Sequence, residues 1–214
     1  MTPEVELEAL LAPAGGGLWL VSTGRAEQVA LQQRLYRVER EADVRARHRA
    51  SLDGIAQARV VVLGIPSDVG AGFQRGANLG PQALRLALLE SADWPEAAAA
   101  AGIVDMGDVR VVPQLLHDDM LAESQKAASR RALYAELAPE DAARLPVSPL
   151  SIAERALDLV FSINPAVRPI VLGGDHSAAW PVVAALAKVR REPWGIVQPD
   201  AHTDLLEERL GVKY

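Results

Sequence analysis

The sequence predicts an α/β protein with a mainly parallel sheet. Short aliphatic runs alternate with segments of helical periodicity, a pattern typical of parallel strands joined by helical crossovers. The run at 59–65 is continuous and β-branched, which indicates a strand that is buried on both faces. A second run begins at 168 and leads directly into Gly173 and Gly174. Polar residues that follow such strands lie where parallel sheets gather functional side chains.

The composition favours a globular protein without a nucleic-acid or membrane partner. The 214 residues suffice for one α/β domain or for part of a larger one, and 50% of them are hydrophobic. A net charge of −6 argues against nucleic acid and anionic membranes, which attract basic faces. The absence of cysteine excludes disulfides, and residues 1–12 do not resemble a secretory leader. We therefore expect a cytoplasmic protein.

Residues 1–58 are expected to form a helical extension in front of an α/β domain at 59–214. Residues 5–12 and 25–58 show helical spacing, and the longer segment mixes charges of both signs with apolar residues. This pattern favours a solvated helix that packs through one face, with a lid or an oligomer contact as the alternatives. His48 stands among arginines and is predicted to lie on the surface.

The remaining elements follow the same alternation. Acidic residues end a short strand near 102–106, and Asp118-Asp119 are typical of a helix start, where carboxylates favour the helix dipole. The other predicted elements are a glycine-rich loop before a helix at 82–90, helical segments within 118–137 and at 151–163 and 178–189, and a last strand within 194–202.

Potential metal ligands follow the last two predicted strands. His176 comes directly after the glycine pair, and Asp200, His202 and Asp204 recur at every second position. In an extended segment this spacing places all three on one side, where His176 would meet them from the neighbouring strand. Carboxylates and imidazoles without sulfur suit Mn²⁺, Fe²⁺ or Zn²⁺, and the majority of oxygen ligands favours Mn²⁺. An aspartate could also bridge two ions.

Four motifs resemble those of the ureohydrolases, the arginase–agmatinase–formimidoylglutamase superfamily. They are GGDHS at 173–177, DAHTD at 200–204, GFQRGANLGPQALR at 72–85 and DMGDV at 105–109, and the resemblance covers roughly residues 59–208. It implies a three-layer α/β/α fold, a homo-oligomer (trimer or hexamer), and hydrolysis of a linear C–N bond in a small guanidino or amidino compound.

The resemblance also implies a dinuclear Mn²⁺ centre. His176 would bind one ion and His202 the other, Asp200 would bridge both, and Asp204 would share the first ion with His176. Asp175 and Ser177 would then orient these ligands, as residues behind metal ligands generally do.

Two departures from the family pattern affect the expected function. No Asp-X-Asp pair follows Asp204 to complete both metal shells, so the chain resembles the N-terminal portion of a longer, truncated domain. A non-catalytic protein that binds metal weakly or acts as an interaction module is therefore the alternative. A single-zinc deacetylase is a further possibility, but such a site does not need both acids of DAHTD.

The second departure concerns the substrate. Arginases resemble one another in an Asn that helps to hold the α-carboxylate, and here Leu206 and Glu207 occupy that region. An apolar and acidic loop favours a cationic substrate without an α-carboxylate. A merely structural surface turn is the alternative. Arg75 and Asn78 of the glycine-rich loop are the other candidates for substrate contact.

Overall fold

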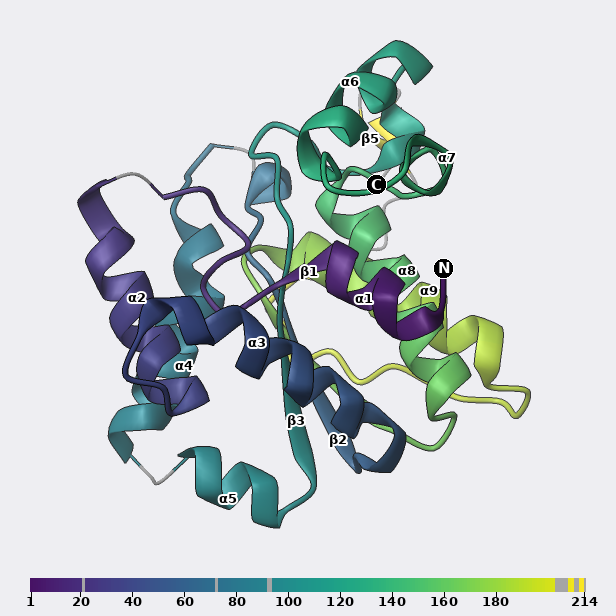
Figure 1. The fold of residues 1–214 in the computed structure, drawn as a ribbon. Helices are drawn as coiled ribbons and strands as arrows, with labels where there is room; N and C mark the ends of the chain where they lie inside the picture. Colours follow the sequence, from purple (N-terminus) through teal and green to yellow (C-terminus); the bar gives the residue numbers. More distant parts are fainter. Residues whose placement is uncertain (21, 72, 92–93, 203–207, 210–211, 214) are drawn as a thin grey trace.

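The computed structural model confirms the α/β class, with a sheet that is parallel except at one edge (Figure 1). The structure describes residues 1–214 except 21, 72, 92–93, 203–207, 210–211 and 214. The strand order is β1-β3-β2-β4, in which β2 pairs in parallel with both β3 and β4, and β1 is antiparallel to β3. The strands of this sheet are β1 (Leu11–Ala12), β2 (Val60–Ile65), β3 (Ile103–Val109) and β4 (Arg168–Gly173), and β5 (Glu208–Arg209) pairs separately with β6 (Val212–Lys213).

Helices cover both faces of the sheet. In Figure 1, α2, α4 and α5 lie on one side of the strands, and α1, α8 and α9 lie on the other. The α-helices are α1 (Pro3–Leu10), α2 (Ser22–Tyr36), α3 (Glu41–Leu52), α4 (Gly80–Ser91), α5 (Trp94–Ala100), α6 (Glu123–Leu133), α7 (Pro139–Ala142), α8 (Pro149–Ile163) and α9 (Ala179–Val189). Short 3₁₀ helices are η1 (Asp53–Gln57), η2 (Val69–Ala71), η3 (Ala77–Leu79), η4 (Asp118–Met120) and η5 (His176–Ala178). This is the expected layered arrangement. Among the described residues, no helix has both the length and the apolar character needed to cross a bilayer.

The N-terminal segment packs into the same core as the sheet. Leu7, Leu10 and Leu11 are fully or almost fully buried and belong to one apolar cluster with β2 and α8. The segment also supplies β1, whose Leu11 pairs with Val109 of β3. The predicted division of the chain at residue 58 remains a prediction, and the two parts share this core.

The predicted helix start at Asp118 and Asp119 is confirmed as the short helix η4, while α6 begins only at Glu123. The Asp118 carboxylate accepts hydrogen bonds from the backbone N–H groups of Val147 (3.2 Å) and Ser148 (2.8 Å). These residues directly precede α8, so Asp118 places a negative charge at the N-terminal end of that helix.

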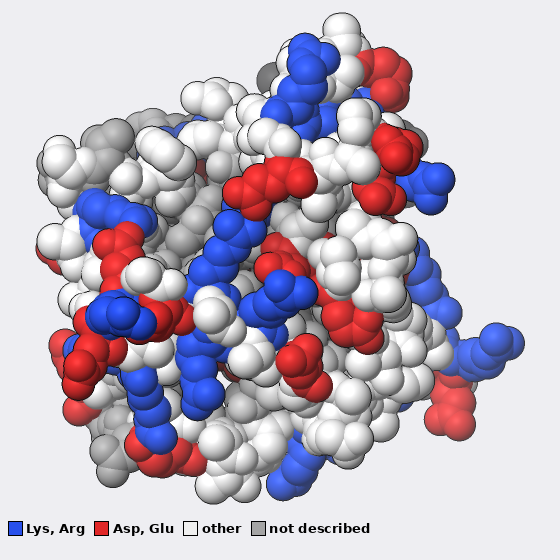
Figure 2. All heavy atoms as spheres, in the orientation of Figure 1, with Lys and Arg blue, Asp and Glu red and all other residues white. Residues whose placement is uncertain are grey.

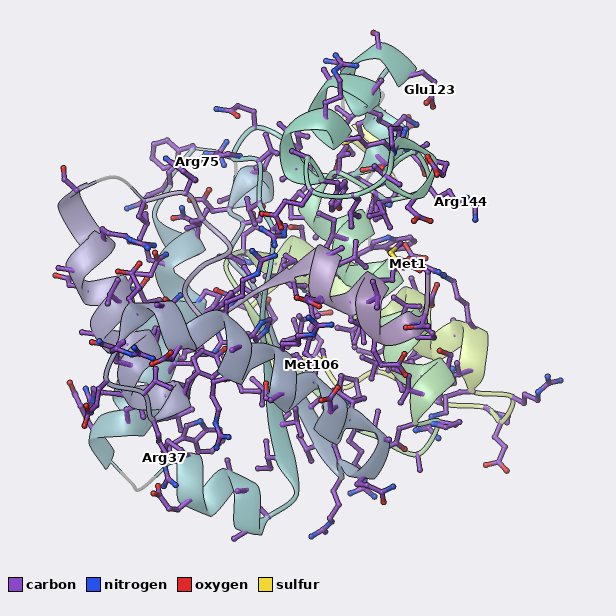
Figure 3. All side chains as sticks on the ribbon, in the orientation of Figure 1. Met1, Arg37, Arg75, Met106, Glu123 and Arg144 are labelled. Atoms are coloured by element: carbon purple, nitrogen blue, oxygen red, sulfur yellow. The ribbon has the colours of Figure 1, made fainter. Side chains whose placement is uncertain are left out.

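The surface position predicted for His48 is wrong. His48 is 2% exposed, and its Nε2 lies 2.8 Å from the carbonyl oxygen of Met106, the residue labelled behind α3 in Figure 3. The reason is helical spacing, because Val44, His48 and Leu52 recur every four residues and share the buried face of α3. The arginines around His48 in the sequence lie on the other faces.

The last predicted strand, within 194–202, does not form. The segment is exposed, with Ile196 at 63% and Val197 at 93%. A β-branched run becomes a strand only where a neighbouring strand pairs with it and buries its side chains. Among the described residues β4 pairs only with β2, and residues 194–202 do not occupy the other edge of β4.

Candidate functional site

The carboxyl ends of β2 and β4 are joined by backbone hydrogen bonds. The Gly174 N–H donates to the Ile65 carbonyl oxygen, and the Asp175 N–H donates to that of Ser67, both at 3.2 Å. A Cβ atom at Gly174 would lie 2.0 Å from the Ser67 oxygen, so only glycine permits this approach. The glycine pair after β4 thus brings the two turns together and fixes where the next residues begin.

Asp175 and Ser177 form a compact turn around His176. Asp175 Oδ1 accepts hydrogen bonds from the Ser177 N–H (2.9 Å) and from the Ser177 hydroxyl. Asp175 Oδ2 is buried and accepts no hydrogen bond from the described residues. This oxygen can therefore accept a hydrogen bond from a group that enters the site.

Three of the four predicted metal ligands meet in what we call the histidine cluster, His176, Asp200 and His202. Asp200 Oδ2 lies 3.7 Å from His176 Nδ1, and Asp200 Oδ1 lies 3.8 Å from His202 Nδ1. One carboxylate therefore faces both imidazoles. The fourth predicted ligand, Asp204, lies outside the described residues.

The predicted route by which these residues meet is wrong. Asp200 and His202 do not alternate along a strand, because Asp200 Oδ1 accepts a hydrogen bond from the His202 N–H at 2.9 Å in a local turn. The hydrogen bond from that N–H, with the two nearby imidazoles, holds the pKa of Asp200 below its usual value, against an opposing effect of desolvation. The carboxylate is therefore kept ionised, as a metal ligand must be.

The donor set of the histidine cluster fits a divalent metal, although the cluster is open. Two imidazoles and a carboxylate between them suit Mn²⁺, Fe²⁺ or Zn²⁺. The His176 side chain is 48% exposed and that of His202 is 82% exposed. Within the part of the chain that the structure describes, no three His, Asp or Glu side chains are grouped closely enough to hold a metal ion. The metal site therefore stays a prediction from the sequence.

The glycine-rich loop at 66–80 is organised by Asp68. Its Oδ2 accepts a hydrogen bond from the Gly76 N–H (2.7 Å), and its Oδ1 lies 3.1 Å from Arg75 Nη1. The Gly76 bond and the Arg75 charge lower the pKa of Asp68, against an opposing effect of desolvation. Arg75, labelled in Figure 3, thus has an internal partner, and Asn78 lies half-buried on the same loop. Leu206 and Glu207, the other candidates for substrate contact, lie outside the described residues.

A buried ion network that the sequence did not predict joins helix α4 to strand β3. We call Arg85, Asp105 and Asp108 the Arg85 network. Arg85 of α4 binds both oxygens of Asp105 at 2.8 Å, and its Nη1 donates to Asp108 Oδ1 at 2.5 Å. Burial alone would lower the pKa of Arg85, but the two carboxylates outweigh it and raise that pKa further above its usual range. Arg85 ends the GFQRGANLGPQALR motif, and the two acids belong to the DMGDV motif. Nothing in the sequence indicated that these residues pair across 20 and 23 positions.

The Arg85 network also holds the N-terminal segment. Asp108 Oδ2 accepts a hydrogen bond from the Gly15 N–H at 2.7 Å. Gly107 has φ +81°, and a Cβ atom there would lie 2.1 Å from the Ala12 carbonyl oxygen. Residues before 58 therefore contact the strand that carries the acidic motif.

Comparisons with known proteins agree with the fold. The fold defines an α/β protein with a mainly parallel sheet, and the turns after β2 and β4 meet at one end of that sheet. The sequence model of the Arginase family matches residues 58–214. The chain belongs to this family.

Several curated relatives support this assignment. Agmatinase from Pyrococcus horikoshii is 29% identical over 164 residues, which is 75% of this chain and 45% of the relative. Mitochondrial agmatinase from Gallus gallus is 30% identical over 170 residues, 77% of this chain and 39% of the relative. Mitochondrial guanidino acid hydrolase from Homo sapiens is 27% identical, covering 71% of this chain and 35% of the relative. The chain thus spans less than half the length of each of these three relatives, and no solved structure matches it.

Proposed function

We propose that the protein acts in manganese-dependent hydrolysis of a linear C–N bond in a guanidino or amidino compound. The observation that carries this proposal is the approach of His176 and His202 to one carboxylate, in a chain of the Arginase family. The names of the relatives, agmatinase and guanidino acid hydrolase, support the substrate class.

Four residues would hold the manganese. We assign His176 to one ion, His202 to the other and Asp200 to both, with Asp204 sharing the first ion. When bound, manganese makes water more acidic and withdraws electrons from the carbon that is attacked. A carboxylate that accepts a hydrogen bond from a metal-binding group commonly orients that group. Asp175 Oδ2 is buried and has no hydrogen-bond partner among the described residues, which supports this role for Asp175.

The substrate that we favour is cationic and lacks an α-carboxylate. The acidic sequence around Leu206 and Glu207 would repel a carboxylate and attract a positively charged chain. Arg75 of the glycine-rich loop already pairs with Asp68, so its charge is partly compensated and less suited to capture a carboxylate. Agmatine is therefore expected to be hydrolysed faster than arginine.

The test is urea release from the full chain loaded with Mn²⁺, supplied separately with agmatine, a guanidino acid and arginine. We expect urea from agmatine, and we expect His176→Ala to lower the rate at least about a hundredfold, because a metal ligand is removed. His117→Ala is the matched control, since His117 lies at η4 and outside the histidine cluster. Equal rates for the two variants would contradict the assignment.

A non-catalytic role is the second candidate, and the exposure of the histidine cluster favours it. Ligands that few neighbours hold in place bind metal more weakly than supported ones. Equilibrium dialysis distinguishes the two functions. Two Mn²⁺ ions per chain together with urea release support the hydrolase, whereas one weakly bound ion or none, without urea, supports the non-catalytic protein.

We also infer a cytoplasmic homo-oligomer, as the family resemblance and the absence of cysteine suggest. Light scattering coupled to size-exclusion chromatography measures the oligomeric state, and a monomer at micromolar concentration would contradict that part of the inference.

A further inference from the structure

A cavity outside the histidine cluster lies between the N-terminal helices and the end of α6. Its volume is about 340 Å³, within the range of roughly 300–1,000 Å³ that is usual for small-molecule sites. None of the candidate metal ligands lines it. The lining residues come from α1, α3, the end of β3 and the end of α6, and they are Val5, Glu8, Ala9, Arg45, Arg110, Ala132, Leu133, Tyr134, Ala135, Glu136 and Leu137.

The charges around this cavity do not compensate one another completely. Charged residues of both signs cover the face on which α1 and α3 lie (Figure 2). Glu136 pairs with Arg45 at 2.8 Å, and Glu8 pairs with Arg49 at 3.2 Å. Both carboxylates of the lining thus already have a guanidinium partner. Among the described residues, no carboxylate lies within 4.0 Å of Arg110.

Arg110 has donors to spare. Its Nε donates to the Ala9 carbonyl oxygen at 2.8 Å, near the C-terminal end of α1, where a cation is favourable. Nε therefore has a hydrogen-bond partner, but the two Nη nitrogens have none in the described part of the chain. Burial and the nearby Arg45 cation lower the pKa of Arg110, and Tyr134, Glu136 and Glu8 do not fully offset them. An anion in the cavity would supply the missing charge and acceptors.

The remaining lining is mainly aliphatic. Val5 and Ala9 come from α1, and Leu133 and Leu137 come from the end of α6 and the turn after it. A ligand that fits both parts has one negative charge and a short apolar body. We propose that this cavity binds a small aliphatic monocarboxylate, with its carboxylate on the Arg110 guanidinium and its hydrocarbon tail against these side chains.

Calorimetric titration of the full chain with acetate, propionate and butyrate tests the proposal. Affinity should rise about fourfold with each added methylene, because each one buries apolar surface. Inorganic phosphate serves as the generic anion and should bind more weakly than butyrate. Equal binding of all four ions would overturn the proposal, as would no binding of butyrate at millimolar concentration.

Two substitutions change the charge of the cavity in opposite directions. Arg110→Gln should weaken butyrate about tenfold or more, because a charge-assisted hydrogen bond is lost. Glu136→Gln should tighten butyrate several-fold, because it frees Arg45, and the exposure of Glu136 makes this variant safe for folding. Arg47→Gln is the matched control, since Arg47 is an exposed residue of α3, the helix that carries Arg45, and it does not line the cavity. If Arg110→Gln fails to fold, an unchanged affinity in Glu136→Gln still overturns the proposal.

Discussion

The Arg85 network and the histidine cluster contain similar ionisable side chains in opposite surroundings. Arg85 and Asp108 are almost completely buried, and their atoms meet at hydrogen-bonding distance. In the histidine cluster, Asp200 lies 3.7 Å from His176 and 3.8 Å from His202, and these two imidazoles are half exposed and largely exposed. Buried ions must be paired, whereas ligands for an exchangeable ion must stay accessible. We therefore expect the first region to control stability and the second to control metal binding.

The largest expected effect is that of Arg85→Met, which leaves the carboxylates of Asp105 and Asp108 buried without their partner. The loss in the free energy of unfolding should be about 3–5 kcal/mol. Guanidinium denaturation measures it, with exposed Arg144→Met as the control. A loss below about 1 kcal/mol would show that the network is not a stabilising feature.

Two glycines give the second comparison. Gly107 lies on β3 between the two acids of the Arg85 network, and Gly195 lies in the segment that leads to Asp200. Gly107→Ala should cost at least about 2 kcal/mol, because φ is +81° and the new Cβ would overlap with Ala12. Gly195→Ala should stay within about 0.5 kcal/mol, since no described residue beyond its chain neighbours has an atom within 4 Å of its Cβ position. Chemical denaturation of the two variants measures both values. Equal losses would contradict the difference in packing.

The pH dependence of stability tests the buried region, because His48 lies near Asp105 and Asp108 of the Arg85 network. Burial outweighs the Met106 hydrogen bond and the nearby acids, and lowers the pKa of His48 below 6.5. The unfolded chain therefore binds a proton near pH 6.5 that the native chain does not. Stability contributed by neutral His48 is complete above this pH and falls as the pH drops below it, by at most about 1.4 kcal/mol per pH unit.

Denaturation of the wild type and His48→Gln between pH 8 and 5 checks this prediction. Glutamine keeps a neutral N–H donor for Met106, so the variant should lose less stability on acidification. Parallel pH profiles for the two proteins would mean that His48 does not contribute.

The smallest expected effect on the apoprotein is that of His176→Ala, within about 0.5 kcal/mol, because the side chain is half exposed. In the presence of Mn²⁺ the wild type and His176→Ala should differ in stability. At 100 times its dissociation constant, Mn²⁺ should stabilise the wild type by about 2.7 kcal/mol and the variant by much less. Thermal melts with Mn²⁺ and after EDTA treatment measure this effect, and equal stabilisation would exclude His176 as a ligand.

Local patterns in the sequence were sufficient for the sheet core and for the position of His176 directly after β4. β2 and β4 are continuous aliphatic runs, and the glycines behind β4 already indicated where His176 would lie. The exposed segment around Ile196 has the same local pattern as a strand, but strand formation depends on a neighbour that local sequence does not specify.

Long-range pairing explains the remaining differences. β1 has two residues and no periodicity, and it exists only because Val109 lies opposite Leu11. The pairing of Arg85 with two acids on another element likewise has no local signal. For His48 a signal was present, because its spacing from Val44 and Leu52 matches one helix face, but the surrounding charges outweighed it in the prediction.

The antiparallel strand β1 also has a consequence for the order in which the chain folds. Leu11 pairs with Val109, and the Gly15 N–H reaches Asp108 across 93 positions of the sequence. During synthesis, the segment around Leu11 leaves the ribosome before β3 and must wait for β3 before it can dock. Until then its leucines stay exposed, and closing so long a loop slows folding. Leu11 and Gly15 are thus among the last residues to reach their native contacts, although they are made long before β3.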